Sequence, residues 1–259
     1  MKKIASISIL AVASALSAGA TMSLPSEWTV DQMTAQYTFE GSSTSEILAN
    51  KVTGSTLPGI YTINNWTAEN GTLIAPTPGT YNGLYFGSNG GDALSLEANW
   101  GVSMSVKVVQ SAKNAGLLQF GNEGTGALYI GDGKLGFKFR NGNVFSISLE
   151  NSFDYASFHD YAVSFVDSSL QIWLDGQDIT ENLTSSSGNT WANTVASYSD
   201  ADWNLKRIAY ANNSGFDSLP QNSVLDEVGV YSLQAVPEPA TATLSLLGLA
   251  ALMVRRRRA

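Results

Sequence analysis

The chain has 259 residues, of which 44% are hydrophobic and 14% charged, with 24 glycines, one histidine and no cysteine. This length suits one large domain, and the hydrophobic content excludes a wholly disordered chain. Six of the 14 basic residues lie at the two ends, which leaves 8 basic against 21 acidic residues between 21 and 235, a net charge of −13. The lack of cysteine excludes disulfide scaffolds and iron–sulfur sites, and the acidic middle excludes a nucleic-acid partner.

The first twenty residues contain the three parts of a secretory signal peptide in their usual order. Two lysines form the positive start, an apolar stretch runs from residue 4 to 16, and Ala18 and Ala20 form a small-x-small cleavage site. We expect residues 1–20 to be a signal helix whose removal leaves Thr21 first in an exported chain. The alternative is an N-terminal core helix.

Between residues 34 and 232 the hydrophobic residues recur with a period of two, which is typical of half-buried antiparallel strands. Five stretches alternate in this way, namely 94–97, 104–108, 135–140, 145–149 and 170–175. Asp132-Gly133, Asn141-Gly142 and Asp175-Gly176 follow or join such runs, as tight hairpins require. The pattern predicts about a dozen strands in residues 21–235 and an all-β fold, a two-sheet antiparallel jelly-roll sandwich.

Four of these stretches together have a recognisable pattern. They are 37–41 (YTFEG), 158–165 (FHDYAVSF), 170–176 (LQIWLDG) and 224–231 (VLDEVGVY). They resemble the opening strand, an aromatic-His strand, a hairpin strand and the closing strand of laminin G-like, concanavalin A-like domains. The chain departs from the family at Phe158, where many members have tryptophan.

The resemblance has a consequence for metal binding. Members of the family often carry one structural Ca²⁺ that ties the first strand to the last, and Glu40 and Asp226 fall at the corresponding positions. The resemblance therefore implies one Ca²⁺ held by oxygen ligands. The alternative is that Glu40 and Asp226 are two ordinary exposed acids.

Catalytic signatures are weak in this sequence. Glucanases with the concanavalin A-like fold carry Glu-x-Asp-x-x-Glu on one strand, but no glutamate here is followed by aspartate two positions later. His159 is the single imidazole, and the chain has no Gly-x-Ser-x-Gly elbow for a nucleophile. We expect no catalytic residue and a protein that is not an enzyme.

The polar stretch from 184 to 204 has no alternation but contains several aromatic residues. Sugars bind by stacking on such rings, with hydrogen bonds from neighbouring polar groups. The candidate ligand-binding residues are Trp191, Tyr198, Asp202 and Trp203. The alternative is that this loop folds back and its rings cap a sheet, while Trp66 and Trp100 lie in the core.

The C-terminal segment, residues 236–259, has three parts. Pro237, Glu238 and Pro239 come first, residues 240–254 are almost wholly apolar, and four arginines follow, namely Arg255, Arg256, Arg257 and Arg258. As a helix, the apolar run is about 22 Å long and therefore short for a bilayer core of about 30 Å. The arginines favour an orientation with the domain outside the cytoplasm.

This order of parts resembles the PEP-CTERM sorting signal of Gram-negative bacteria. The resemblance implies an exosortase as partner, a short transmembrane helix that holds the protein transiently in the inner membrane, and cleavage near Pro237–Pro239. It also implies delivery to the cell surface or extracellular matrix. The alternative is an ordinary tail anchor.

Taken together, the sequence favours an exported surface or extracellular-matrix protein with a lectin-like sandwich. Its role would be adhesion, glycan binding or assembly of an exopolysaccharide matrix. Two alternatives stay open: an extracellular glycoside hydrolase or lyase with an atypical carboxylate pair, and a structural coat protein without a ligand.

Overall fold

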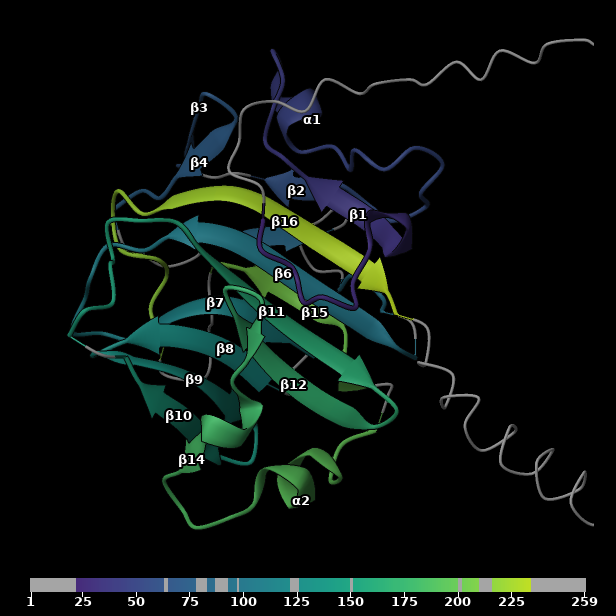
Figure 1. Cartoon of the computed structure of the whole chain (residues 1–259). Coiled ribbons are helices and arrows are strands. Elements are labelled where there is room, and N and C mark those ends of the chain that lie inside the picture. Colours follow the sequence, from purple (N-terminus) through teal and green to yellow (C-terminus); the bar gives the residue numbers. More distant parts are fainter. Residues whose placement is uncertain are drawn as a thin grey trace, which may run out of the picture.

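The computed structural model describes residues 22–62, 65–77, 83–86, 93–96, 98–121, 126–149, 151–199, 202–209 and 216–233. Within these residues two antiparallel sheets pack against each other, so the predicted all-β sandwich is confirmed (Figure 1). The signal segment with Ala18 and Ala20 lies outside the described residues, as does the C-terminal segment from 234 onward. In the part of the chain that the structure describes, no helix has the length and apolar character needed to cross a membrane.

The first sheet, sheet A, has the strand order β13-β12-β11-β6-β16-β4-β3, and β1 also pairs with β16. Its strands are β1 (Met33–Tyr37), β3 (Thr67–Glu69), β4 (Thr72–Ile74), β6 (Trp100–Lys107), β11 (His159–Val166), β12 (Ser169–Leu174), β13 (Gln177–Asp178) and β16 (Val224–Ser232). The stretches that resemble the laminin G-like family therefore form β11, β12 and β16. The first strand pairs directly with the last, in a register that joins Met33 to Tyr231 and Tyr37 to Val228.

The second sheet, sheet B, has the order β14-β10-β9-β8-β7-β15-β5-β2. Its strands are β2 (Ile60–Thr62), β5 (Leu84–Phe86), β7 (Ala115–Phe120), β8 (Gly126–Gly131), β9 (Lys134–Phe139), β10 (Val144–Ser148), β14 (Thr184–Ser185) and β15 (Leu205–Ile208). The described helices are short: α1 (Thr44–Ile47), α2 (Trp191–Val195) and two 3-10 turns, η1 (Val30–Gln32) and η2 (Thr180–Asn182).

The alternating side chains of both sheets meet in one core. In β9 the predicted pattern holds, since Leu135, Phe137 and Phe139 are buried while Lys134 is exposed. The hairpin between β8 and β9 has φ of 48° at Asp132 and 68° at Gly133, the left-handed pair that a two-residue turn needs. Turn chemistry and side-chain period therefore agree with the sequence prediction here.

The structure corrects two predicted strands. Of the predicted strand 94–97 the structure describes residues 94–96, which do not form a strand, and Leu94 makes only an isolated bridge to Leu205. β6 is not half-buried, because seven of its eight residues are buried, including Ser103 and Ser105 on its outer face. The side chains of β6 do alternate between its two faces, but both faces are covered by other parts of the chain.

The cover on the outer face of sheet A is the N-terminal segment 22–32, here called the strap. In Figure 1 the strap passes in front of β16 and β6. Ser23 donates its backbone N–H to the carboxylate of Asp160 on β11. The ring of Trp28 lies so close to Gly101 that a Cβ there would be 2.4 Å from it. Glycine at this position of β6 therefore makes room for the tryptophan, which completes a second apolar cluster with Ala162, Trp173, Tyr231 and Leu233.

Candidate functional site

The aromatic loop 184–204 lies against the edge of the core. Trp203 has 0% of its surface exposed and packs against Trp100 and Phe120 with ring centroids 6.2 Å away. The prediction that Trp203 offers a stacking surface to a ligand is therefore corrected. A ring without exposed surface cannot meet a sugar, and its burial contributes core packing instead.

The other rings of this loop are partly buried. Trp191 begins α2, packs against Phe145 and donates its Nε1–H to the carbonyl of Leu170 over 2.7 Å. Tyr198 stacks on Phe139 with centroids 5.6 Å apart. Through these contacts both rings cap the sandwich.

Asp202 has a local role in the same loop. Its carboxylate accepts hydrogen bonds of 2.8 Å from both the backbone N–H and the hydroxyl of Ser199. These bonds hold the pKa of Asp202 below its usual range, the hydroxyl contributing most. The carboxylate closes a turn, and the sugar-binding role of Trp191, Tyr198 and Asp202 stays a prediction.

The implied calcium ligands lie near each other. Asp226 sits at an irregularity in β16, between Leu225 and Glu227, and is half-buried. Burial, followed by repulsion from Asp160 and Glu40, raises its pKa. Among the described residues, however, no three acidic or histidine side chains form a group that would hold a metal ion. Two carboxylates supply fewer oxygens than the six to eight that Ca²⁺ takes.

His159 is held on both sides of its ring. Nδ1 lies 2.8 Å from Oδ2 of Asp175, and Nε2 lies 3.0 Å from the backbone carbonyl of Asp154. Phe153 stacks on the ring at 4.1 Å. Both ring nitrogens are therefore used by the protein itself, and His159 joins the loop at Asp154 to the turn at Asp175, which follows β12.

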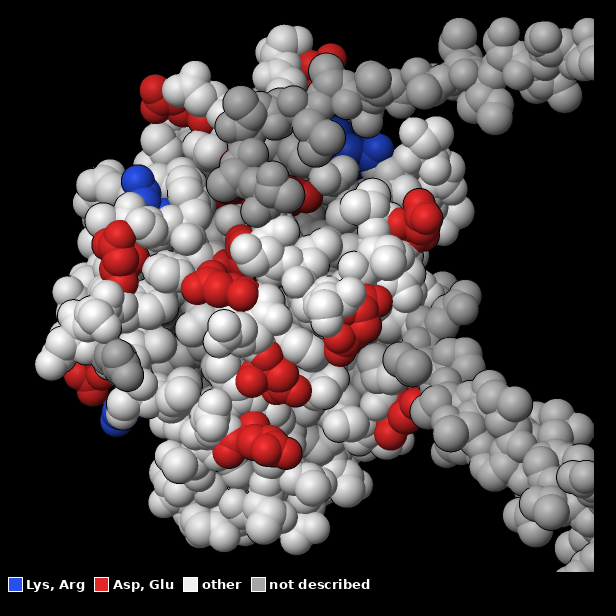
Figure 2. All heavy atoms as spheres, in the orientation of Figure 1, with Lys and Arg blue, Asp and Glu red and all other residues white. Residues whose placement is uncertain are grey.

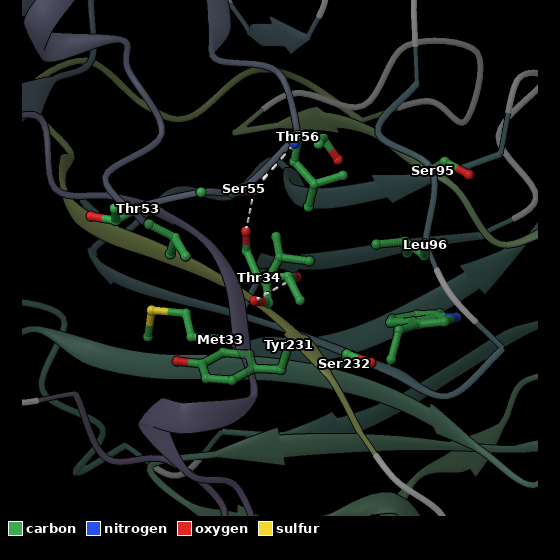
Figure 3. Close-up of a pocket in the computed structure, with 14 residues that line it drawn as sticks. Met33, Thr34, Thr53, Ser55, Thr56, Ser95, Leu96, Tyr231 and Ser232 are labelled. Atoms are coloured by element: carbon green, nitrogen blue, oxygen red, sulfur yellow. Dashed lines mark hydrogen bonds between the residues drawn. The ribbon is translucent and has the colours of Figure 1, made fainter.

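A pocket of about 350 Å³, which no sequence motif indicates, lies where β1 and β16 meet (Figure 3). Half of its lining residues carry hydroxyl groups and none is charged. The lining consists of Met33, Thr34, Val52, Thr53, Gly54, Ser55, Thr56, Leu57, Ser95, Leu96, Trp100, Val230, Tyr231 and Ser232. Figure 3 shows Thr53, Ser55 and Thr56 on one side and Ser95 with Leu96 on another, above Tyr231 and Ser232.

The pocket wall formed by residues 52–57 is fixed to β1. Ser55 donates its hydroxyl to the carbonyl of Thr34 over 2.6 Å and accepts from the side chain of Asn50 and the N–H of Leu57. Asn50 also accepts from the N–H of Gln36. The wall is therefore pre-formed, which lowers the entropic cost of binding a ligand.

The chemistry of the pocket suits a neutral, hydroxyl-rich ligand. Thr53, Thr56 and Ser95 are exposed, and their hydroxyls make no hydrogen bond to another described residue. Burial raises the pKa of Tyr231 to about 12, so its phenol stays neutral at any physiological pH. Leu96, which is partly exposed, provides an apolar part of the wall. The Ser/Thr/Gly run at 53–56 was the only sequence signal, and nothing in it indicated that 95–96 and β16 lie beside it.

Charge distinguishes this pocket from the surface around the sandwich. On the face shown in Figure 2, acidic side chains are spread widely, whereas lysine and arginine appear only near the margins. A polyanion would be repelled by such a surface. The uncharged pocket within an acidic domain therefore favours neutral ligands over anionic ones.

Comparison with protein families identifies the tail. The model of the PEP-CTERM protein-sorting motif matches residues 235–258. The C-terminus is a PEP-CTERM sorting motif, as predicted, and it marks an exported protein of Gram-negative type with a membrane-anchored C-terminus. No curated protein sequence matches the chain.

Solved structures resemble the sandwich at very low sequence identity. The binding domain of botulinum neurotoxin DC, in complex with rat synaptotagmin II, is 9% identical, with a TM-score of 0.52 over 79% of this chain and 49% of that one. An endo-1,3-beta-glucanase from Streptomyces sioyaensis is 12% identical over 83% of this chain and 100% of that one, with a TM-score of 0.49. Trypanosoma rangeli sialidase is 14% identical, with a TM-score of 0.48 over 78% of this chain and 31% of that one. The chain thus spans about a third of the sialidase and half of the toxin chain, and the likeness concerns the fold alone.

Proposed function

We propose that this protein is exported, processed at its PEP-CTERM motif by an exosortase-type enzyme, and displayed at the cell surface or in the extracellular matrix as a glycan-binding module. The observation that carries the proposal is the match of residues 235–258 to the sorting motif, directly behind a folded β-sandwich. The signal peptide predicted at 1–20 and the net charge of −13 between 21 and 235 agree with a secreted domain.

The pocket between β1 and β16 is the proposed glycan site. Sugars present hydroxyl groups at their edges and C–H groups on their faces, which match the hydroxyl-rich and apolar walls. A volume of about 350 Å³ is at the small end for ligand pockets and suits the end of a glycan chain. In this role the protein binds without catalysis and contributes to adhesion or to an exopolysaccharide matrix.

A glycoside hydrolase is the second candidate, and one pair of carboxylates favours it. Asp160 and Glu227 both pair with Ser105, from opposite sides, so all three share one face of sheet A. Burial raises the pKa of Glu227, as a general acid requires. However, Asp160 already accepts the N–H of Ser23, and Glu227 accepts the amide of Gln36 over 2.7 Å. Because one oxygen of each carboxylate already accepts a hydrogen bond from the protein itself, we place binding ahead of hydrolysis.

Two tail variants test the sorting proposal in a host that has the sorting enzyme. Replacing Arg255–Arg258 by serine removes the charges that stop translocation, so the tail should pass through the membrane and be secreted unprocessed. Replacing Pro237, Glu238 and Pro239 by alanine should leave the protein at full length in the inner membrane, because the prolines hold that stretch extended for the enzyme.

Mass spectrometry of the surface-located protein decides between sorting and a plain anchor. The proposal predicts a C-terminus near Pro237–Pro239, and a surface protein that still contains Arg258 would contradict it. Reducing-sugar release from polysaccharides, measured on the same preparation, tests the hydrolase alternative. If the native protein releases reducing sugars and Glu227→Gln does not, the protein is a hydrolase and the proposed binding role is wrong.

A further inference from the structure

The last strand of the sandwich is fixed up to its final described residue. β16 pairs with β6 as far as Ser232, which lies opposite Trp100. Leu233 then donates its N–H to the carbonyl of Asn99 over 2.9 Å. Its side chain is only 6% exposed and packs in the cluster with Trp28 and Tyr231. The folded domain therefore extends to residue 233.

The sorting motif follows almost without a linker. It begins at residue 235, so that only Gln234 lies between it and Leu233. Four residue steps separate Leu233 from Pro237, and a fully extended chain covers at most about 14 Å in four steps. Whatever processes the stretch Pro237–Pro239 must therefore work within that distance of the folded sandwich.

The end of the sandwich at this point, here called the β16 rim, consists of residues 28–33, 98–100, 166–169 and 231–233. Figure 1 shows that β16 ends where β1 begins, and Met33 pairs with Tyr231. Val30 in η1 is 73% exposed, more than any other large hydrophobic residue among those described. Asp31 and Asp167 are exposed, and these four stretches contain no lysine or arginine. The rim thus carries one exposed apolar side chain and two exposed acidic ones.

We propose that the β16 rim is the surface by which the folded sandwich docks on the membrane-embedded sorting enzyme while the tail is processed. The enzyme's facing surface would offer an apolar patch for Val30 and neutral or basic groups opposite Asp31 and Asp167. The inference rests on the proposed function, since it needs a sorting enzyme to act on the tail.

A protein partner fits the rim better than lipid does. Anionic headgroups attract basic segments and repel carboxylates. The rim has two exposed carboxylates and no basic residue, so direct adsorption to such a membrane is disfavoured. The short connection nevertheless holds the rim close to the membrane. Contact with the enzyme would separate the carboxylates of the rim from the lipid headgroups.

Two exposed valines at opposite ends of the sandwich allow a matched test. Val30→Glu changes the rim, and Val109→Glu makes the same change beyond the far end of β6, where Val109 is 40% exposed. Each variant is made in the full chain, with and without a 12-residue Gly/Ser linker between Leu233 and Gln234. Such a linker has a reach of about 20 Å and frees the rim from the processing site. The readout is the rate of tail removal in the native host, followed by pulse labelling and intact mass.

The expected result is a rate about tenfold lower for Val30→Glu in the native connection, equivalent to about 1.4 kcal/mol. Val109→Glu should be processed at the native rate, and the linker should restore Val30→Glu. Without the linker, the tail of Asp31→Lys should also be removed slowly, because the new lysine repels a basic surface on the enzyme. Equal melting temperatures of the processed proteins show that folding is not the cause.

Three results would overturn the inference. The first is removal of the tail from Val30→Glu and Asp31→Lys at the native rate. This result would reject docking by the rim but would leave the proposed sorting of the protein unaffected. The second is a defect that the linker does not relieve. The third is binding of the processed protein to phosphatidylglycerol vesicles that Val30→Glu abolishes, which assigns the rim to lipid. If the native tail is never removed, the proposed function fails, and the inference fails with it.

Discussion

The aromatic loop 184–204 and the pocket between β1 and β16 contrast in how sequence and structure present them. The loop has tryptophans in a polar stretch, the usual sequence sign of a sugar site, yet Trp203 is fully buried and Trp191 uses its indole N–H on Leu170. The pocket has no such sign, yet it gathers hydroxyl groups from four separate stretches around an open volume. Exposure, rather than residue type, therefore distinguishes a binding surface from a cap.

The contrast also shows how the two regions are stabilised. The loop is held by apolar burial of large rings, so its residues should contribute most to the free energy of unfolding. The pocket wall is held by hydrogen bonds of Ser55 and Asn50, so its exposed hydroxyls are free to serve a ligand. Mutations in the two regions should therefore separate stability from binding.

The largest effect is expected for Trp203→Ala. Truncation of a fully buried tryptophan leaves a cavity among Trp100, Phe120 and Phe137 and should lower the free energy of unfolding by about 3–5 kcal/mol. Chemical denaturation measures this loss. Trp191→Phe is the matched control within the loop, and its cost should stay near 1 kcal/mol because chiefly one hydrogen bond is lost. Equal costs for the two variants would contradict the assignment of Trp203 to the core.

The strap offers an intermediate effect. Gly101→Ala places a methyl group against the Trp28 ring and should cost about 1–3 kcal/mol of stability, as overpacking does. In the background of Trp28→Ala the same change should cost little, because the ring is gone. A double-mutant cycle of thermal or denaturant unfolding measures this coupling. Additive costs would show that the strap does not lie on β6 in solution.

A smaller effect of opposite sign is expected at Asp226. Its pKa is raised by burial and then by Asp160 and Glu40, so the folded state holds the proton more tightly than the unfolded state does. Stability is therefore lost as the pH rises through that pKa. Asp226→Asn should raise the free energy of unfolding at pH 7 by about 0.5–1 kcal/mol, with allowance for solvent screening. The gain should vanish below about pH 3.9, the unfolded value.

Glu181→Gln removes the same charge from the exposed turn η2 and should change stability by much less, which makes it the control for net charge. The same pair of proteins tests the predicted calcium. If Glu40 and Asp226 share Ca²⁺, millimolar calcium should raise the melting temperature of the native protein but not of Asp226→Asn. An identical melt of the native protein with calcium and with chelator would reject the ion.

Sequence reasoning succeeded where local pattern and burial agree. The alternation in β9 and the Asp132-Gly133 turn specified both the strands and their hairpin, and the closing stretch became β16. It failed for β6, because both faces of this strand are covered by residues far away in the sequence, with Trp28 against Gly101 and Tyr231 beside Ser103. It also failed for residues 94–96, where the pairing with β15 is limited to the single bridge between Leu94 and Leu205.

The pocket could not be predicted for a related reason. Its walls come from β1, the loop 52–57, residues 95–96 and β16, and only the pairing of the first strand with the last brings them together. The order of residues contains no local signal of that meeting. The tail, by contrast, is a linear signal, and Pro237-Glu238-Pro239 with the terminal arginines could be identified without any structure.

The measurement that most directly tests the account is a glycan array with three forms of the exported protein purified from the host surface. They are the native protein, Thr56→Trp, which fills the pocket from its exposed wall, and Trp191→Phe, which alters the aromatic loop. The account predicts that the native protein and Trp191→Phe bind the same neutral glycans and that Thr56→Trp loses them with an unchanged melting temperature. Binding that persists in Thr56→Trp but is lost in Trp191→Phe would contradict it, as would a native protein that binds no neutral glycan.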